Sequence, residues 1–278
     1  MTTSSGNQLP VGLRYVTVYE LLASGLPKAG AVPATAYQGL EFEGPKAFSL
    51  NVPEARKITH VGEDRPLAID YLPPTEGMDG ELQVSPSEFN IIALLGDVVM
   101  ATAAEKTFIP MATSQQGFEP QVGMLMYQQS LDVDSGIRTW RSFIVPSARC
   151  IYMPSGMGPD TIDTRYKVAP AVTQKHLWGK SLADGTEGCT SVQVLELHTI
   201  ARPNIVAWLA TSGGGTTVFN FPTEKPNLFA TRPASIVVWV DGVKYVNGAG
   251  AGEVAVDATK LTFGTAIVSK TVVCFYEW

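Results

Sequence analysis

The chain has 278 residues, of which 45% are apolar and 17% are charged, and its formal net charge is −6. This length and composition predict one large domain or two ordinary ones with a full hydrophobic core. No uncharged apolar run reaches the roughly eighteen residues of a membrane-spanning helix, so we expect no membrane partner. Acids and bases balance from Leu209 to Trp278, which places the acidic excess in residues 1–208. Binding to the phosphate backbone of nucleic acid needs clustered Lys and Arg, so we expect an acidic chain of this kind not to bind it.

The N-terminal residues 1–15 are polar and lack the basic start and apolar run of a secretory signal, so we expect a flexible arm. The three cysteines, Cys150, Cys189 and Cys274, lie far apart in sequence and form no CxxC pair. This spacing predicts buried free thiols in a reducing compartment rather than a disulfide or zinc framework.

Short alternating or β-branched runs, separated by Gly, Pro, Asn and Asp, dominate the first part of the chain. In the segment LEFE, apolar residues alternate with Glu41 and Glu43, which predicts a strand with one apolar and one acidic face. Further strands are predicted over residues 46–52 and 81–85. Residues 53–66 are rich in turn formers, which predicts an irregular connection after the strand over 46–52.

One helix is predicted, over Pro86–Leu95. It begins with Ser85-Pro86-Ser87-Glu88, a capping box with proline at the first helical position. Apolar residues then recur at helical spacing until Gly96-Asp97 ends the pattern. We expect this helix to cover one open face of a sheet.

Two long strands are predicted over residues 123–131 and 137–151. The turn sequence DVDSG lies between them, so the two segments form a β-hairpin. Two more strands are predicted over residues 166–173 and 190–200, with a loop between them.

The glycine-rich stretch TSGGGT marks a change in composition. It predicts a flexible linker at residues 209–215, which divides the chain into a domain over 1–208 and a small all-β module over 216–278. In that module, Asp241-Gly242 lies between two strand-like runs and is a strong hairpin signal. Several short strands with regular turns favour a β-sandwich.

Catalytic and metal-binding motifs are missing from the sequence. The histidines His60, His176 and His198 are widely separated and form no HxxxH or HxH spacing. Gly179-Lys180-Ser181 resembles the end of a phosphate-binding loop, but the motif needs a glycine where Gln174 stands. We therefore expect a protein that is not an enzyme, with no catalytic residue, no cofactor and no metal.

The segment from Gly39 to Ser85 resembles the major tail tube proteins of long-tailed bacteriophages. Strands lead to RKITHVGEDR, DYLPP with an acidic turn follows, and a strand then enters the capped helix. This resemblance extends over about residues 10–208. The segments VVWVDGVKY and KLTFGTAIVSKTVVCFYE, joined by a glycine-rich stretch, resemble the small immunoglobulin-like β modules of phage tail proteins.

This resemblance implies a mainly-β fold in which two packed antiparallel sheets, as a sandwich or barrel, are flanked by the predicted helix, with a small C-terminal all-β domain. It also implies that six copies form a ring, that rings stack into a non-contractile tail tube, and that DNA passes through during ejection without specific binding. The implied partners are other copies of the chain, a tape measure protein, and tail terminator and distal tail proteins. The implied location is the virion, after synthesis in the cytoplasm of the host bacterium.

An acidic channel wall reduces the adhesion of DNA phosphates, because repulsion persists over about 8 Å at physiological salt. From strand alternation, the expected lumen-facing acids are Glu41, Glu43 and Glu196. The alternative for each residue is a solvated outer face.

Two other functions compete with the tail tube. One is a different virion component, either a capsid decoration protein or a tail terminator. The other is a carbohydrate-binding adhesin, in which Trp239, Tyr245, Tyr276 and Trp278 would stack on sugars. In strands, such aromatic residues more often belong to the core.

Overall fold

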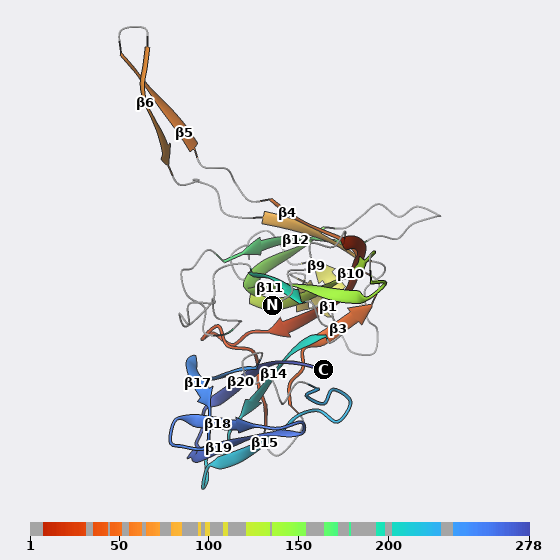
Figure 1. The fold of residues 1–278 in the computed structure, drawn as a ribbon, viewed down its shortest axis with the longest axis vertical. Helices are drawn as coiled ribbons and strands as arrows, with labels where there is room; N and C mark the ends of the chain where they lie inside the picture. The colour runs from red at the N-terminus through yellow and green to blue at the C-terminus, as the bar shows by residue number, and fades with distance from the viewer. Residues whose placement is uncertain are drawn as a thin grey trace.

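The computed structural model contains two large β-sheets and two separate two-stranded sheets (Figure 1). Strands make up nearly all of the regular structure in the described part of the chain, which confirms the predicted mainly-β fold. The structure describes residues 8–31, 36–43, 45–51, 56–62, 65–72, 79–84, 94–95, 98–100, 108–110, 121–133, 135–153, 164–171, 178, 193–197, 202–228 and 236–278.

The first sheet is curled into a nearly closed barrel. Strands β1 and β4 approach each other across the remaining gap without a hydrogen-bonded ladder between them. A further strand, β13 (Gln193–Leu197), pairs with β11 alongside the main path. The strands follow one another in the order β3 (Leu40–Glu43), β1 (Gln8–Glu20), β10 (Gln121–Asp132), β11 (Arg138–Met153), β12 (Thr164–Pro170), β7 (Asp79–Val84) and β4 (Pro45–Asn51).

The long strands β10 and β11 lie in the middle of the strand order of this sheet. They pair as an antiparallel hairpin, which confirms the hairpin predicted around DVDSG. Strand β11 changes partner along its length: residues 140–144 pair with β13, and residues 148–153 pair with β12. The change surrounds Pro146, which has no N–H to donate to a ladder. The barrel interior is filled by Val16, Val18, Leu82, Val84, Leu95, Val122, Met124, Met126, Val145, Ala148, Cys150, Tyr166 and Val168.

The second sheet folds over its own apolar core. Trp208, Phe219 and Phe263 lie at its centre, and both Trp208 and Phe263 make edge contacts with Phe219. Its strands follow the order β15 (Thr216–Asn220), β19 (Lys260–Ile267), β18 (Glu253–Val256), β17 (Val243–Asn247), β16 (Val237–Val240), β20 (Thr271–Glu277), β14 (Pro203–Leu209) and β2 (Gly30–Ala31).

Strand β20 is buried on both faces, so the two sheets share a third core. Val272, Cys274 and Tyr276 point into the core of the second sheet, whereas Val273 and Phe275 pack against the barrel. The shared core consists of Tyr19, Leu26, Leu125, Tyr127, Ile144, Trp178, Ile205, Ala207, Val237, Trp239, Val273 and Phe275. The C-terminal strands are therefore packed on the barrel through an apolar face.

The structure differs from the predicted linker at residues 209–215. Strand β14, which precedes that segment, pairs with β20 from Pro203↔Glu277 to Leu209↔Thr271. The glycine-rich stretch is consequently a turn that joins β14 to β15 within one sheet. Gly214 and Gly215 both have a φ of 73°, a left-handed conformation that glycine adopts without steric cost, and this explains the composition of the stretch.

A two-stranded hairpin, β5 (Arg56–Gly62) and β6 (Arg65–Leu72), projects far from both large sheets (Figure 1). It lies where the turn-rich sequence predicted an irregular connection over 53–66, so that prediction was wrong for most of the segment. A second small sheet pairs β8 (Val98–Met100) with β9 (Phe108–Pro110).

Two further expectations concern the N-terminal arm and the helix. The arm expected over residues 1–15 is an ordered strand from Gln8 onward, because β1 pairs with β10 from Gln8↔Asp132. The helix expected over Pro86–Leu95 lies outside the described residues except for its last two positions. Leu94 and Leu95 have a helical backbone, and Leu95 is fully buried in the barrel core.

Candidate functional site

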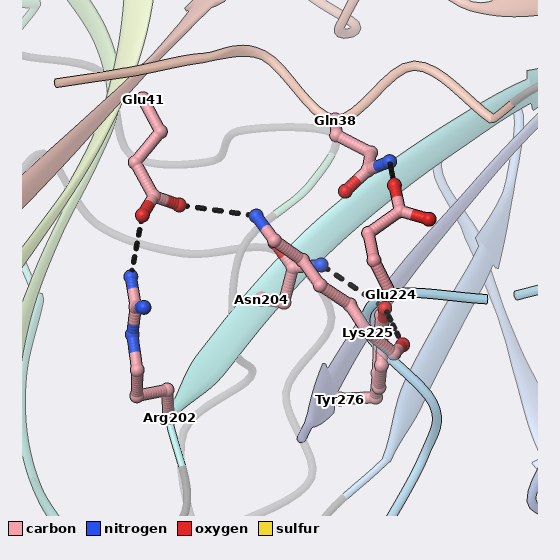
Figure 2. Close-up of polar contacts among 7 residues, drawn as sticks. All are labelled: Gln38, Glu41, Arg202, Asn204, Glu224, Lys225 and Tyr276. Atoms are coloured by element: carbon pink, nitrogen blue, oxygen red, sulfur yellow. Dashed lines mark hydrogen bonds and ion pairs between the residues drawn. The ribbon is translucent and has the colours of Figure 1, made fainter. Parts of the chain in front are cut away.

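A cluster of three charged residues joins the two sheets at the edge of their shared core (Figure 2). Arg202 Nη2 donates a hydrogen bond to Glu41 Oε1 at 2.8 Å, and Lys225 Nζ donates to Glu41 Oε2 at 3.0 Å. Glu41 belongs to β3 of the barrel, whereas the two cations belong to the C-terminal part of the chain. We call Glu41, Arg202 and Lys225 the inter-sheet ion cluster.

Aromatic rings surround the Arg202 guanidinium. Its central carbon lies 3.9 Å from the ring centre of Tyr15 and 5.0 Å from that of Trp278, within the range of cation–π attraction. The rings of Tyr127 and Trp140 lie at 5.2 and 5.9 Å. Three of these rings come from the barrel and one from the C-terminus, so the guanidinium binds both sheets at once.

The backbone holds Arg202 in this position. Its N–H donates to the Trp278 carbonyl at 3.0 Å, and the Trp278 N–H donates to the Arg202 carbonyl at 2.9 Å. These two bonds extend the β14–β20 ladder by one pair. As a result, the guanidinium and the Trp278 indole are fixed beside each other at the end of the second sheet.

Lys225 is positioned by a second set of hydrogen bonds, which Figure 2 also shows. The Tyr276 hydroxyl donates to the Lys225 carbonyl at 2.7 Å and accepts from Asn204 Nδ2 at 3.0 Å. Next to it, Gln38 Nε2 donates to Glu224 Oε1 at 2.7 Å, which ties the segment before β3 to the turn that carries Lys225.

The electrostatic environment keeps Glu41 ionised. Burial raises the pKa of its carboxyl, but the hydrogen bonds and charges of Arg202 and Lys225 outweigh burial and lower the pKa below its ordinary value. Its side chain is only 24% exposed, and the two cations are each 15% exposed. The cluster is thus a structural bridge of one carboxylate and two cations, in which both Glu41 oxygens accept a hydrogen bond from a cation.

The structure describes the surroundings of the predicted lumen acids in different detail. Glu41 contacts two cations and therefore adds little negative charge to any channel wall. For Glu43 and Glu196, the structure describes the backbone alone: Glu43 lies opposite Tyr15 at the barrel edge, and Glu196 lies opposite Arg141. The structure does not bring these three acids into a single described cluster.

The aromatic residues considered for sugar stacking belong to the cores. Trp239 and Tyr276 are 1% and 0% exposed. Tyr245 and Trp278 are half-buried against the core of the second sheet. Since stacking on a sugar needs an exposed ring face, the buried Trp239 and Tyr276 cannot belong to a carbohydrate platform.

Other candidate chemistry is limited in the described part of the chain. Cys150 and Cys274 are free and buried, and burial raises the pKa of both thiols. Cys189, His176 and His198 lie outside the described residues, and His60 is a backbone partner of Ala68 in the projecting hairpin. Among the described residues, no three His, Cys, Asp or Glu side chains are grouped to hold a metal. No helix among them is both long and apolar enough to span a bilayer.

Sequence reasoning singled out Glu41 but missed both of its cations. Arg202 and Lys225 lie 161 and 184 residues away from it, and no spacing motif links them. Comparison with known proteins adds no family, because no protein-family model matches the chain and no curated protein is significantly similar to it.

Proposed function

We propose that this chain is the structural subunit of the tail tube of a long-tailed bacteriophage. In this proposal, copies assemble into hexameric rings, and the rings stack into a conduit through which DNA leaves the virion. The resemblance in the sequence suggests this function, and the observation that supports it best is the projecting β5–β6 hairpin (Figure 1).

The hairpin has no pairing partner among the other described strands. Its two strands pair with each other from Arg56↔Leu72 to Gly62↔Arg65, and neither has a ladder with any other described strand. An isolated two-stranded hairpin is at best marginally stable in water, whereas three or more strands or a packed face stabilise it. In the proposed assembly, a neighbouring copy in the same ring or in the next ring supplies such a face.

The charge of the chain agrees with a conduit for DNA. The formal net charge of −6 lies in residues 1–208, and an acidic chain has a low affinity for phosphates. Glu41 is neutralised within the molecule, so Glu43 and Glu196 remain the proposed lumen acids.

Negative-stain electron microscopy of the purified chain at low and high concentration tests the proposal. We expect hollow tubes or stacked rings with an axial hole when the protein is concentrated. A variant in which a short Gly-Ser link replaces residues 56–72 tests the role of the hairpin. It should keep the circular dichroism spectrum of the folded barrel, but its rings should no longer stack. Uniform small particles of the intact chain at every concentration would contradict the tube function and favour a decoration or terminator protein.

A further inference from the structure

The end of β17 carries a chemically reactive pair of residues. Asn247, the last residue of β17, is followed by Gly248, whereas the other six asparagines of the chain precede Gln, Val, Ile, Phe or Leu. The carboxamide carbon of an asparagine lies within reach of the next backbone nitrogen, and their reaction closes a five-membered ring. A bulky residue after the asparagine hinders this attack. Glycine hinders it least, because it has no Cβ and the widest choice of backbone conformations.

The carboxamide of Asn247 is free to approach the backbone. Its side chain is exposed to solvent, and within the described part of the chain no hydrogen bond or ion pair holds it. Two nearby asparagines are instead buried and held: Asn204 Nδ2 donates to the Tyr276 hydroxyl, and Asn227 Nδ2 donates to the Asp257 carbonyl at 3.1 Å. A carboxamide without such bonds turns toward the backbone without losing a protein partner.

One backbone hydrogen bond holds the attacking nitrogen. The Gly248 N–H donates to the Val254 carbonyl at 3.1 Å. This bond belongs to the short parallel ladder between β17 and β18, which consists of the pairs Val246↔Glu253 and Asn247↔Val254. A ladder of two pairs beside an exposed loop opens locally at a much lower free energy than the core does. Ring closure therefore needs a local opening and leaves the rest of the sheet intact.

The loop after Asn247 supplies backbone freedom. Residues 248–252 have the sequence Gly-Ala-Gly-Ala-Gly, and residues 249–252 are exposed. The Gly250 N–H donates to Glu253 Oε2 at 2.7 Å, and the Glu253 N–H donates to the Gly250 carbonyl at 3.1 Å. Neither of these two bonds involves the peptide group between Asn247 and Gly248.

We propose that Asn247 is a site of spontaneous deamidation through a succinimide. The Gly248 nitrogen forms a bond to Asn247 Cγ, the Cγ–Nδ2 bond breaks, and the side-chain nitrogen leaves as ammonia with the proton of the Gly248 N–H. The reaction is favoured because both groups belong to one dipeptide. One solvent water then opens the ring. Cleavage at Cγ gives aspartate at position 247, and cleavage at the main-chain carbonyl carbon gives isoaspartate.

The two products differ in their effect on the sheet. Both add one negative charge to the loop that contains Glu253. Isoaspartate also adds a methylene group to the backbone at the end of β17, which shifts Gly248 relative to Val254 and weakens the β17–β18 ladder. Aspartate keeps the backbone length unchanged.

Peptide mapping of the folded full-length chain during incubation in mildly alkaline buffer tests the proposal. Trypsin cleaves after Lys244 and Lys260 and releases the peptide 245–260, which contains Asn247. We expect this peptide to be lost with time and to be replaced by two products of equal mass, which chromatography separates. Two such products identify the succinimide route, because direct hydrolysis of the carboxamide gives aspartate alone.

Asn220 is the internal control for this experiment. It is also exposed and ends a strand, but it precedes Phe221, whose N–H donates to the Thr259 carbonyl at 2.8 Å. Asn220 should stay intact over the same time. The variant Asn247→Gln is the matched control: its ring would need six members, so its peptide 245–260 should stay unmodified, and circular dichroism should show the same fold. Conversion of Asn247 no faster than that of Asn220, or to aspartate alone, would overturn the proposal.

Discussion

At the scale of single residues, Arg202 links the two sheets through several contacts at once. It combines an ion pair to Glu41 with stacking over Tyr15, and it is only 15% exposed. Partly buried charge interactions of this kind contribute more than surface pairs because solvent screens them less.

The substitution Arg202→Met tests this contribution. We expect the free energy of unfolding to fall by about 2 kcal/mol, since a charge-assisted hydrogen bond and a cation–π contact are both lost. Lys28→Met is the control: it removes an ion pair of 2.7 Å to Glu20 in which both side chains are about half exposed. That change should cost no more than roughly 0.5 kcal/mol. Equal effects in urea titrations of the two variants would show that Arg202 contributes only as a surface charge does.

The cluster itself could not be predicted from the sequence. Alternation in the segment LEFE correctly placed Glu41 in a strand, but the predicted faces differ: Leu40 is 36% exposed, whereas the Glu41 side chain is 24% exposed. Its partners depend on how the second sheet docks on the barrel, and that docking joins residues 161 and 184 positions apart. A formal charge count therefore described Glu41 as a free acid, whereas the folded chain neutralises it.

At the scale of elements, Gly123 allows β10 to pack against Trp178. A Cβ atom at Gly123 would contact the Trp178 ring directly. That ring is fully buried, donates from Nε1 to the Gly25 carbonyl at 3.0 Å and makes an edge contact with Tyr19. The strand and the indole thus share one tightly filled space in the core between the sheets.

We expect Gly123→Ala to lower the free energy of unfolding by about 1–3 kcal/mol, because an added methyl group overpacks this space. Gly213→Ala provides the comparison: a Cβ at Gly213 meets no atom within 4 Å, and its backbone is not left-handed. Its stability should stay within about 0.5 kcal/mol of the unchanged protein. Thermal unfolding of the two variants measures the difference, and similar melting temperatures would argue against tight packing at Gly123.

Local signals predicted elements well where a turn determines them. Asp241 and Gly242 have φ values of 49° and 83°, the left-handed pair that a tight hairpin needs, and β16 and β17 pair around them as expected. The same local view misread TSGGGT as a linker, because a glycine run has the same composition in a linker and in a turn. The overlooked signal was the segment TVVCFYE, whose continuous apolar run is typical of a strand that is buried on both faces. The second face is covered by the barrel, and a separate small module would leave it exposed to water.

At the scale of the whole molecule, the second sheet is not an independent domain. Its strand β14 pairs with the edge strand β2, and the Ala207 backbone of β14 exchanges two hydrogen bonds with Tyr37, at 2.9 and 3.0 Å. Residues from the first forty of the chain therefore complete a sheet built from the last eighty. One face of that sheet, including Trp239 and Phe275, is buried only because the barrel covers it.

This organisation predicts a single cooperative unfolding transition for the unassembled chain. Separation of the sheets would expose the shared core to water at a cost of about 1.5–3 kcal/mol for each large apolar side chain, so neither sheet is stable without the other. Calorimetry and circular dichroism at a concentration below assembly should give coincident midpoints and equal calorimetric and van't Hoff enthalpies. For the same reason, the isolated fragment 216–278, which lacks β14, should fail to fold. Two resolved transitions, or a folded fragment, would instead mean that the contact between the sheets is weak enough to open while each sheet stays intact.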